Sequence, residues 1–114
     1  MGWTAPALNG GDEASRRFLN EMVDDAFIAQ RCFAARKLVP PIPLTDQQLE
    51  SLAPPTLFMV GEQEVIFKAS DALARLAAVA PQIQTALIAD CGHDLFVVKA
   101  GEVNRRIVQF LQQH

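Results

Sequence analysis

The feature that most constrains the fold is a short apolar run, Thr56-Leu57-Phe58-Met59-Val60, which follows Pro54-Pro55 and stops at Gly61. A run this short, without alternation between apolar and polar residues, is typical of a strand that is buried on both faces. Such strands belong to parallel sheets that helices cover. The segment therefore predicts an α/β structure.

A second strand is predicted shortly after this run. Residues 71–80 place apolar side chains at helical spacing, and Ser70 is positioned to cap that helix. The segment from Ile83 to Ala89 has the pattern of another strand, and Gly92 breaks the chain after it. A strand, a helix and a strand of these lengths predict a right-handed parallel crossover.

The segment before this unit, residues 1–43, is predicted to be separate from it. We expect a loose lead-in, one helix or two broken helices at about 13–37 with Asp12 as the N-cap, and a Pro-rich extended connector at 38–43. The helix has a wide apolar stripe, which predicts that it packs against something large.

The unit from residue 44 to residue 114 is predicted to begin and end with helices. Thr45 and Gln48 form the pattern of a capping box, which begins a short helix at 46–52. A last helix is expected from Glu102 to Gln113, with apolar residues on one side. The strands and helices of this unit then follow one another as strand, helix, strand, helix.

The composition excludes several classes of protein. The chain has 114 residues, of which half are hydrophobic and a fifth are charged, so it should bury a core as one small folding unit. Its net charge is −3 and its longest basic runs are pairs, which does not favour binding to nucleic acid. No apolar run approaches the length of a membrane span, and no secretory signal is recognised at the N-terminus. A cytoplasmic protein with reduced Cys32 and Cys91 is therefore expected.

Two loops follow the predicted strands, and both contain residues that can transfer protons. The first loop, Gly61 to Phe67, contains Glu62 and Glu64; the second, Ala89 to Asp94, contains His93. In open parallel sheets the functional loops follow the carboxyl ends of the strands. If the strands are neighbours, an acid of the first loop can orient the imidazole of the second, which is the acid–base half of a nucleophilic triad.

Each of these residues also has a simpler interpretation. A histidine after a glycine is more often a surface or core residue, and loop glutamates are usually solvated. Cys91 is close to His93 in sequence and is an alternative nucleophile, although a small buried apolar role fits it better. A zinc site needs three or four converging ligands, and the terminal His114 is poorly placed to provide one, so no metal or other cofactor is predicted. The joint placement of the acids and His93 after successive strands favours the catalytic interpretation.

Three segments resemble the end of an α/β-hydrolase of the carboxylesterase and lipase type. Residues 55–64 are similar to the family's late strand and its Gly-x-x-acid turn, residues 86–94 to its final strand and Gly-His turn, and residues 102–111 to its closing helix. The resemblance covers residues 44 to 112, and the preceding helix and connector resemble a cap region. It implies that Glu64 is the acid and His93 the general base, with Glu62 as a competing acid. The family usually has Asp at this position.

The nucleophile of the family is missing from these residues. The resemblance implies a serine on a G-x-S-x-G elbow before the acid, yet Ser15, Ser51 and Ser70 all lack flanking glycines. The pair is then a relic or an incomplete triad, and the chain a truncated hydrolase-like protein or a piece of a larger one. Hydrolysis of esters or related acyl compounds would need a partner that supplies the serine.

Self-association is the other expectation. A pair of parallel strands leaves at least one sheet edge unpaired, and such an edge is a template for another chain. We therefore expect a homodimer or a higher homo-oligomer. The alternative to an enzymatic role is accordingly a non-catalytic, self-assembling binding module.

Overall fold

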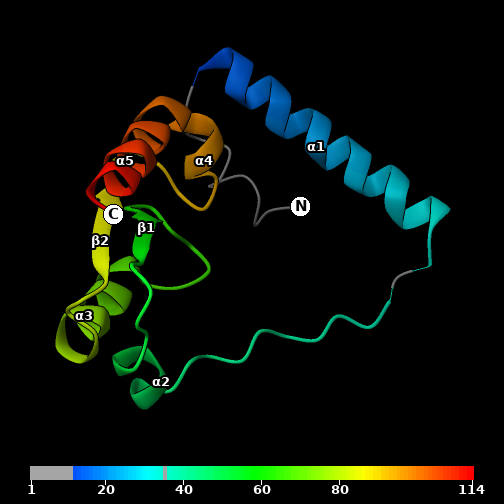
Figure 1. Cartoon of the computed structure of the whole chain (residues 1–114). Helices are drawn as coiled ribbons and strands as arrows, with labels where there is room; N and C mark the ends of the chain where they lie inside the picture. The colour runs from blue at the N-terminus through cyan, green and yellow to red at the C-terminus, as the bar shows by residue number, and fades with distance from the viewer. Residues whose placement is uncertain (1–11, 35) are drawn as a thin grey trace.

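The computed structural model describes residues 12–34 and 36–114, and the predicted lead-in at residues 1–11 lies outside them. Within these residues the chain forms helices and two strands in the order shown in Figure 1. The elements are α1 (Glu13–Cys32), α2 (Asp46–Glu50), β1 (Leu57–Gly61), α3 (Ala69–Val79), β2 (Gln84–Ile88), α4 (Leu95–Val98) and α5 (Ala100–Gln113).

The two strands pair in parallel, as predicted. The register joins Leu57 to Gln84 at one end and Gly61 to Ile88 at the other, with α3 as the crossover between them. Both strands therefore end at the same edge of the sheet, and the loops that follow them leave side by side.

Helices cover both faces of this sheet. Because successive side chains of a strand point to opposite faces, Phe58 and Met59 belong to different clusters. Phe58 packs with a cluster of α2, α3 and the residues before β2. Met59 packs with a second cluster that includes residues of β2, α4 and the turn between them. The members of the first cluster are Leu49, Leu76, Ala80 and Ile83, and those of the second are Ala86, Ile88 and Cys91.

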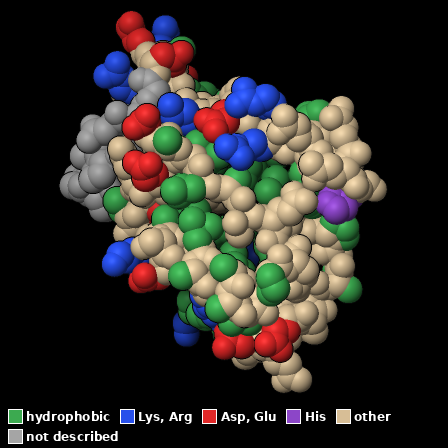
Figure 2. All heavy atoms as spheres, turned by 90° about the vertical axis from the view of Figure 1, so that its left-hand side faces the viewer, with side chains coloured by type: hydrophobic (Ala, Val, Ile, Leu, Met, Phe, Trp, Pro, Cys, Tyr) green, Lys and Arg blue, Asp and Glu red, His purple; other side chains and the backbone are tan. Residues whose placement is uncertain are grey.

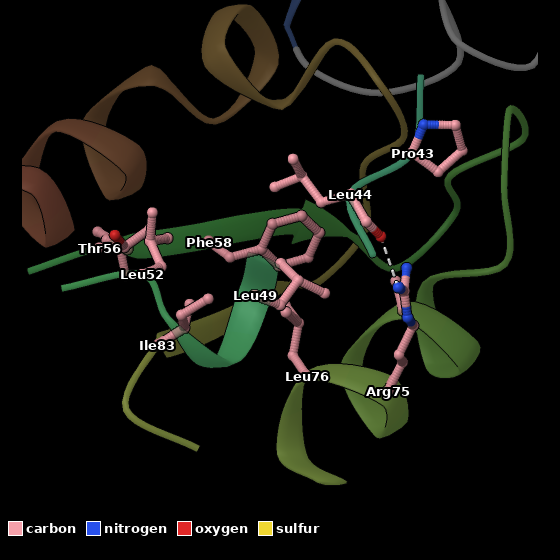
Figure 3. A pocket seen from close by; sticks show the side chains of 11 residues that line it. Pro43, Leu44, Leu49, Leu52, Thr56, Phe58, Arg75, Leu76 and Ile83 are labelled. Carbon is pink, nitrogen blue, oxygen red and sulfur yellow. Dashed lines mark hydrogen bonds between the residues drawn. The ribbon is translucent and has the colours of Figure 1, made fainter. Parts of the chain in front are cut away.

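An apolar pocket of about 360 Å³ lies between α2, β1 and α3 (Figure 3). Arg75 of α3 borders the pocket. Its guanidinium donates to Asp46 Oδ1 of α2 at 2.9 Å and to the carbonyl of Leu44, which precedes α2, at 2.7 Å. The pocket is lined by Thr56, which precedes β1, and by Phe58 near the start of the strand, so it lies away from the loop that follows the strand.

The strands are less buried than the apolar run predicts. In β1 only Val60 and Gly61 are buried, and in β2 only Ala86 and Ile88. Leu87 is 44% exposed. The burial on both faces that the sequence predicts for residues 56–60 is confirmed only in part: clusters pack on both faces of β1, but Leu57, Phe58 and Met59 are half-buried, because among the described residues the sheet has only two strands. Each strand then lacks a neighbour on one side.

The first helix is shorter than predicted and makes few packing contacts with the rest of the described chain. Asp12 caps α1 as expected, since its carboxylate accepts from Ser15 N–H at 2.8 Å. The helix ends at Cys32 instead of residue 37, and Leu19 is its buried residue. Figure 1 shows α1 leading away from the sheet, with a long connector that returns to α2. Within the described part of the chain, the apolar stripe of α1 therefore has no large partner.

Two details of the other helices also differ from the predictions. The capping box of α2 is confirmed, because Thr45 Oγ1 accepts from Gln48 N–H and Gln48 Oε1 accepts from Thr45 N–H. The predicted cap of α3 is wrong: Lys68 occupies the cap position and Ser70 lies inside the helix, where it has no capping bond. The short helix α4 has no counterpart in the sequence predictions. Among the described helices, none is long and apolar enough to cross a membrane.

Candidate active site

The loops after β1 and β2 bring Glu64 and His93 together. The Nδ1 atom of His93 lies 2.8 Å from Glu64 Oε2. The other carboxylate oxygen, Oε1, accepts hydrogen bonds from the backbone N–H groups of Val65 and Ile66, both at 3.0 Å. Both oxygens of Glu64 are thus engaged, and the carboxylate is held in one orientation toward the imidazole ring.

Backbone contacts join the two loops directly. The N–H of Glu62 donates to Ile88 O at 2.8 Å, and the N–H of Gln63 donates to Cys91 O at 2.8 Å. These bonds continue the pairing of the two strands past their ends. The acid and the histidine are therefore placed by the main chain of both loops and not by their side chains alone.

The hydrogen bond determines the tautomer of His93. A carboxylate only accepts, so the proton of the neutral ring lies on Nδ1 and the lone pair on Nε2. The side chain of His93 is 58% exposed, whereas that of Glu64 is 2% exposed. The arrangement thus presents Nε2 as a proton acceptor to the surroundings while the carboxylate behind it is shielded from solvent.

Competing effects act on the pKa of Glu64. Burial by itself would raise this pKa, but the N–H of Ile66, the His93 ring and the N–H of Val65 all favour the charged form. The net result is a pKa below the ordinary value of a glutamate. The carboxylate that orients His93 is therefore ionised at neutral pH.

The structure distinguishes between the two acids of the first loop. Glu62 is exposed, and its backbone N–H, rather than its carboxylate, contacts the second loop. Glu64 is the residue whose carboxylate reaches His93. The Glu64 side chain, longer than the aspartate that the resemblance implies at this position, therefore still reaches the ring.

Cys91 is not placed to act as a nucleophile. Its side chain is fully buried in the second cluster, and its thiol donates to Ile88 O at 3.4 Å. Burial, followed by the nearby charge of Asp94, raises the pKa of the thiol. A protonated, buried thiol is inert, which agrees with the packing interpretation of this residue.

Asp94 is a residue that the sequence analysis did not single out. It directly follows His93, occupies the N-cap position of α4 and is 6% exposed. Neither of its carboxylate oxygens has a hydrogen-bond partner among the described residues. Burial raises its pKa. Nothing in the sequence pattern distinguishes such a buried carboxyl from the exposed aspartates of other loops.

The class of protein follows from this geometry and from comparison with known proteins. A parallel strand–helix–strand–helix unit, with an acid after one strand and a histidine after the next, is the arrangement of the C-terminal part of an α/β-hydrolase. The relatives of the chain within this class are bacterial carboxylesterases. No protein-family model matches the chain.

Two curated relatives come from Bacillus subtilis strain 168. The carboxylesterase YbfK is 35% identical over 71 residues, which are 62% of this chain and 24% of YbfK. A carboxylesterase named nap is 36% identical over 70 residues, or 61% of this chain and 23% of nap. The chain thus spans about a quarter of the length of these curated relatives.

Solved structures of Bacillus subtilis esterases give the same result. The crystal structure of carboxylesterase CesB (YbfK) superposes with a TM-score of 0.63 at 32% identity, over 75% of this chain and 30% of CesB. Naproxen esterase superposes with a TM-score of 0.66 at 27% identity, over 94% of this chain and 43% of the esterase. The second match covers too much of the chain to be limited to residues 44–114, so it extends into the segment that contains α1.

Proposed function

We propose that this chain provides the acid and the base of an ester-hydrolysing site whose nucleophile comes from outside these 114 residues. The observation that carries the proposal is the 2.8 Å contact between His93 Nδ1 and a Glu64 carboxylate that two backbone N–H groups hold in place. This is the pairing that a general base needs in order to keep the correct tautomer.

The chemistry of the pair follows from its proton positions. Nε2 of His93 accepts the proton of an attacking hydroxyl group, which makes the hydroxyl oxygen nucleophilic toward an ester carbonyl. Glu64 then stabilises the positively charged ring through the Nδ1–H bond. The ring returns the proton to the departing alcohol, and the same cycle with water releases the acid.

The serines of these residues do not supply the nucleophile. Ser51 occupies the C-cap of α2 and its hydroxyl donates to Gln48 O at 3.1 Å, while Ser15 and Ser70 lie within α1 and α3. An oriented imidazole without a nucleophile and an oxyanion hole lacks the groups that contribute most to acyl-transfer catalysis. We therefore expect this chain alone to be inactive toward esters. Carboxylic esters are the proposed substrate class because the relatives are named carboxylesterases.

A complementation assay tests this function. The chain is co-expressed with the part of YbfK that lies outside the matched region, the complex is purified, and hydrolysis of p-nitrophenyl acetate is measured. We expect activity from the complex and none from the chain alone. His93→Ala should abolish the activity, and Glu64→Gln should reduce it. A complex that forms with the folded wild-type chain but has no activity would contradict the proposal. Full activity of the complex with His93→Ala would contradict it as well.

Self-association is a second proposed property, and the outer edge of β2 favours it. Gln84 N–H donates to Thr56 O, and Ile88 O accepts from Glu62 N–H, so these two residues of β2 face β1. The alternate residues Thr85 and Leu87 therefore direct their backbone groups away from β1. Figure 2 shows hydrophobic side chains gathered on the side of the molecule where β2, α3 and α5 lie. Leu87 is 44% exposed and Val108 is 51% exposed. We propose that a second copy pairs with this edge about a two-fold axis.

Sedimentation of the purified chain tests the dimer. We expect the wild type to be a dimer at micromolar concentration and Leu87→Lys to be a monomer, because a charge on an edge strand prevents edge pairing. Leu38→Lys is the matched control, since Leu38 lies in the connector and is 89% exposed. A wild-type monomer would contradict this proposal, whereas Glu64→Gln and His93→Ala should leave the association unchanged.

A further inference from the structure

The end of β1 leaves no space for a side chain at residue 61. A Cβ atom added to Gly61 would lie 2.3 Å from Gly92 O and 2.6 Å from Cys91 O. Both obstacles are backbone atoms, which cannot move aside as the tip of a flexible side chain can. The requirement for glycine is one of space, because residue 61 belongs to a regular strand.

Gly61 contacts both of the turns that contain the candidate catalytic residues Glu64 and His93. The carbonyl of Gly61 accepts the N–H of Glu64 at 3.2 Å, which closes the turn that carries the acid. The backbone of residues 91–92, which immediately precedes His93, occupies the space where a side chain of residue 61 would lie. One residue thus contacts both the acid turn and the histidine turn.

We infer that Gly61 is a positioning residue, whose missing side chain allows the histidine turn to approach closely enough for the Glu64–His93 hydrogen bond. Its meaning for catalysis rests on the function proposed above. With alanine at residue 61, Gly92 O would have to withdraw from 2.3 Å to at least 3.0 Å from the new Cβ. Such a displacement of Gly92 also moves the adjacent His93. The 2.8 Å contact between His93 and Glu64 is then lost, because hydrogen bonds weaken steeply with distance and misalignment.

The tautomer of His93 reports this positioning directly. Nitrogen-15 NMR of the neutral ring distinguishes Nδ1–H from Nε2–H, and the Glu64 bond requires the Nδ1–H form. We expect the full wild-type chain to hold Nδ1–H, and Gly61→Ala to shift the ring toward Nε2–H, as Glu64→Gln does. Gly101→Ala is the matched control, since no atom lies within 4 Å of a Cβ at that helical position. It should leave the tautomer unchanged and thermal stability unchanged or raised.

The spectra are recorded in sodium sulfate, which stabilises folded chains, with circular dichroism on the same samples. A folded Gly61→Ala chain that keeps the wild-type Nδ1–H signal would overturn the inference. A chain that is unfolded even in sulfate would overturn it as well, since Gly61 would then serve the whole fold and not the acid–histidine geometry. The experiment needs no nucleophile, so its result is independent of the complementation assay.

Discussion

Glu64 and His93 share one short hydrogen bond, yet they occupy opposite environments: the acid side chain is 2% exposed and the imidazole is 58% exposed. Two backbone N–H groups of the loop and the imidazole ring bond to the carboxylate, whereas most of the ring itself faces solvent. The pair therefore combines a fixed, shielded carboxylate with an imidazole ring that solvent can reach.

Acid should weaken the folded state through Glu64. Because the folded-state pKa of Glu64 is lowered, its stabilisation is complete above the pKa of the unfolded chain and is lost as the pH falls through the folded value. At neutral pH we expect Glu64→Gln to lower the free energy of unfolding by about 1.5–3 kcal/mol, the worth of hydrogen bonds to a charged group. The difference from wild type should shrink toward pH 3 in urea titrations followed by circular dichroism. Glu62→Gln, at an exposed position, should run parallel to wild type.

Asp94 should have the opposite effect on stability. Burial raises its pKa in the folded state, so ionisation of Asp94 destabilises the folded chain. This loss of stability begins as the pH rises above the ordinary pKa of an aspartate and is complete above the folded-state pKa. Asp94→Asn keeps the shape and removes the charge, so we expect a gain of about 1–2 kcal/mol at pH 7 and little gain in acid. Chemical denaturation at both pH values measures it. Asp24→Asn, at an exposed site in α1, is the control, and a loss of stability in Asp94→Asn at pH 7 would show that the carboxylate has a partner.

The two cysteines should react at very different rates. Cys32 is exposed at the end of α1, whereas Cys91 is fully buried and its thiol has a raised pKa. Because the thiolate is the reactive form, iodoacetamide at pH 7.5 should label Cys32 and leave Cys91 unmodified in the native chain. Mass spectrometry of the digest reads out both sites, and Cys32→Ser isolates the buried one. Rapid native labelling of Cys91 would mean that the turn before His93 opens.

The core beneath the site should be sensitive to the loss of volume. Ile88 is fully buried, and its carbonyl accepts from both Glu62 N–H and the Cys91 thiol. Ile88→Ala should cost about 2–5 kcal/mol, because it leaves a cavity in the cluster that supports the histidine turn. Leu111→Ala, in the exposed part of α5, should cost much less. Equal midpoints for the two variants in urea would contradict this packing.

The order of the elements could be predicted from local patterns. The apolar run that ends at Gly61 indicates a strand, and the spacing after it indicates a crossover helix and a parallel partner. Asp12 and the pair Thr45 and Gln48 marked helix starts correctly, because a cap bonds to backbone groups within three residues of itself. The resemblance of residues 55–64 and 86–94 to hydrolase turns likewise depends on short segments.

Local patterns failed where packing decides the outcome. Ser70 has the chemistry of a cap, but the chain enters α3 earlier, at Lys68, and Ala69 is buried. The stripe of α1 predicts a large partner, yet among the described residues α1 packs mainly on the short helix α4 and leaves Phe18 and Met22 exposed. The buried charge of Asp94 has no signature in its neighbours along the chain.

The sequence by itself determined which segments are strands and that an acid and a histidine follow successive strands, because propensity, caps and turns act over a few residues. Only the tertiary structure decided that Glu64, and not Glu62, meets His93, and that Gly61 must accept the backbone of Gly92. These relations join residues that are far apart along the chain, and their distances depend on how two strands pair and on the space that remains between their loops.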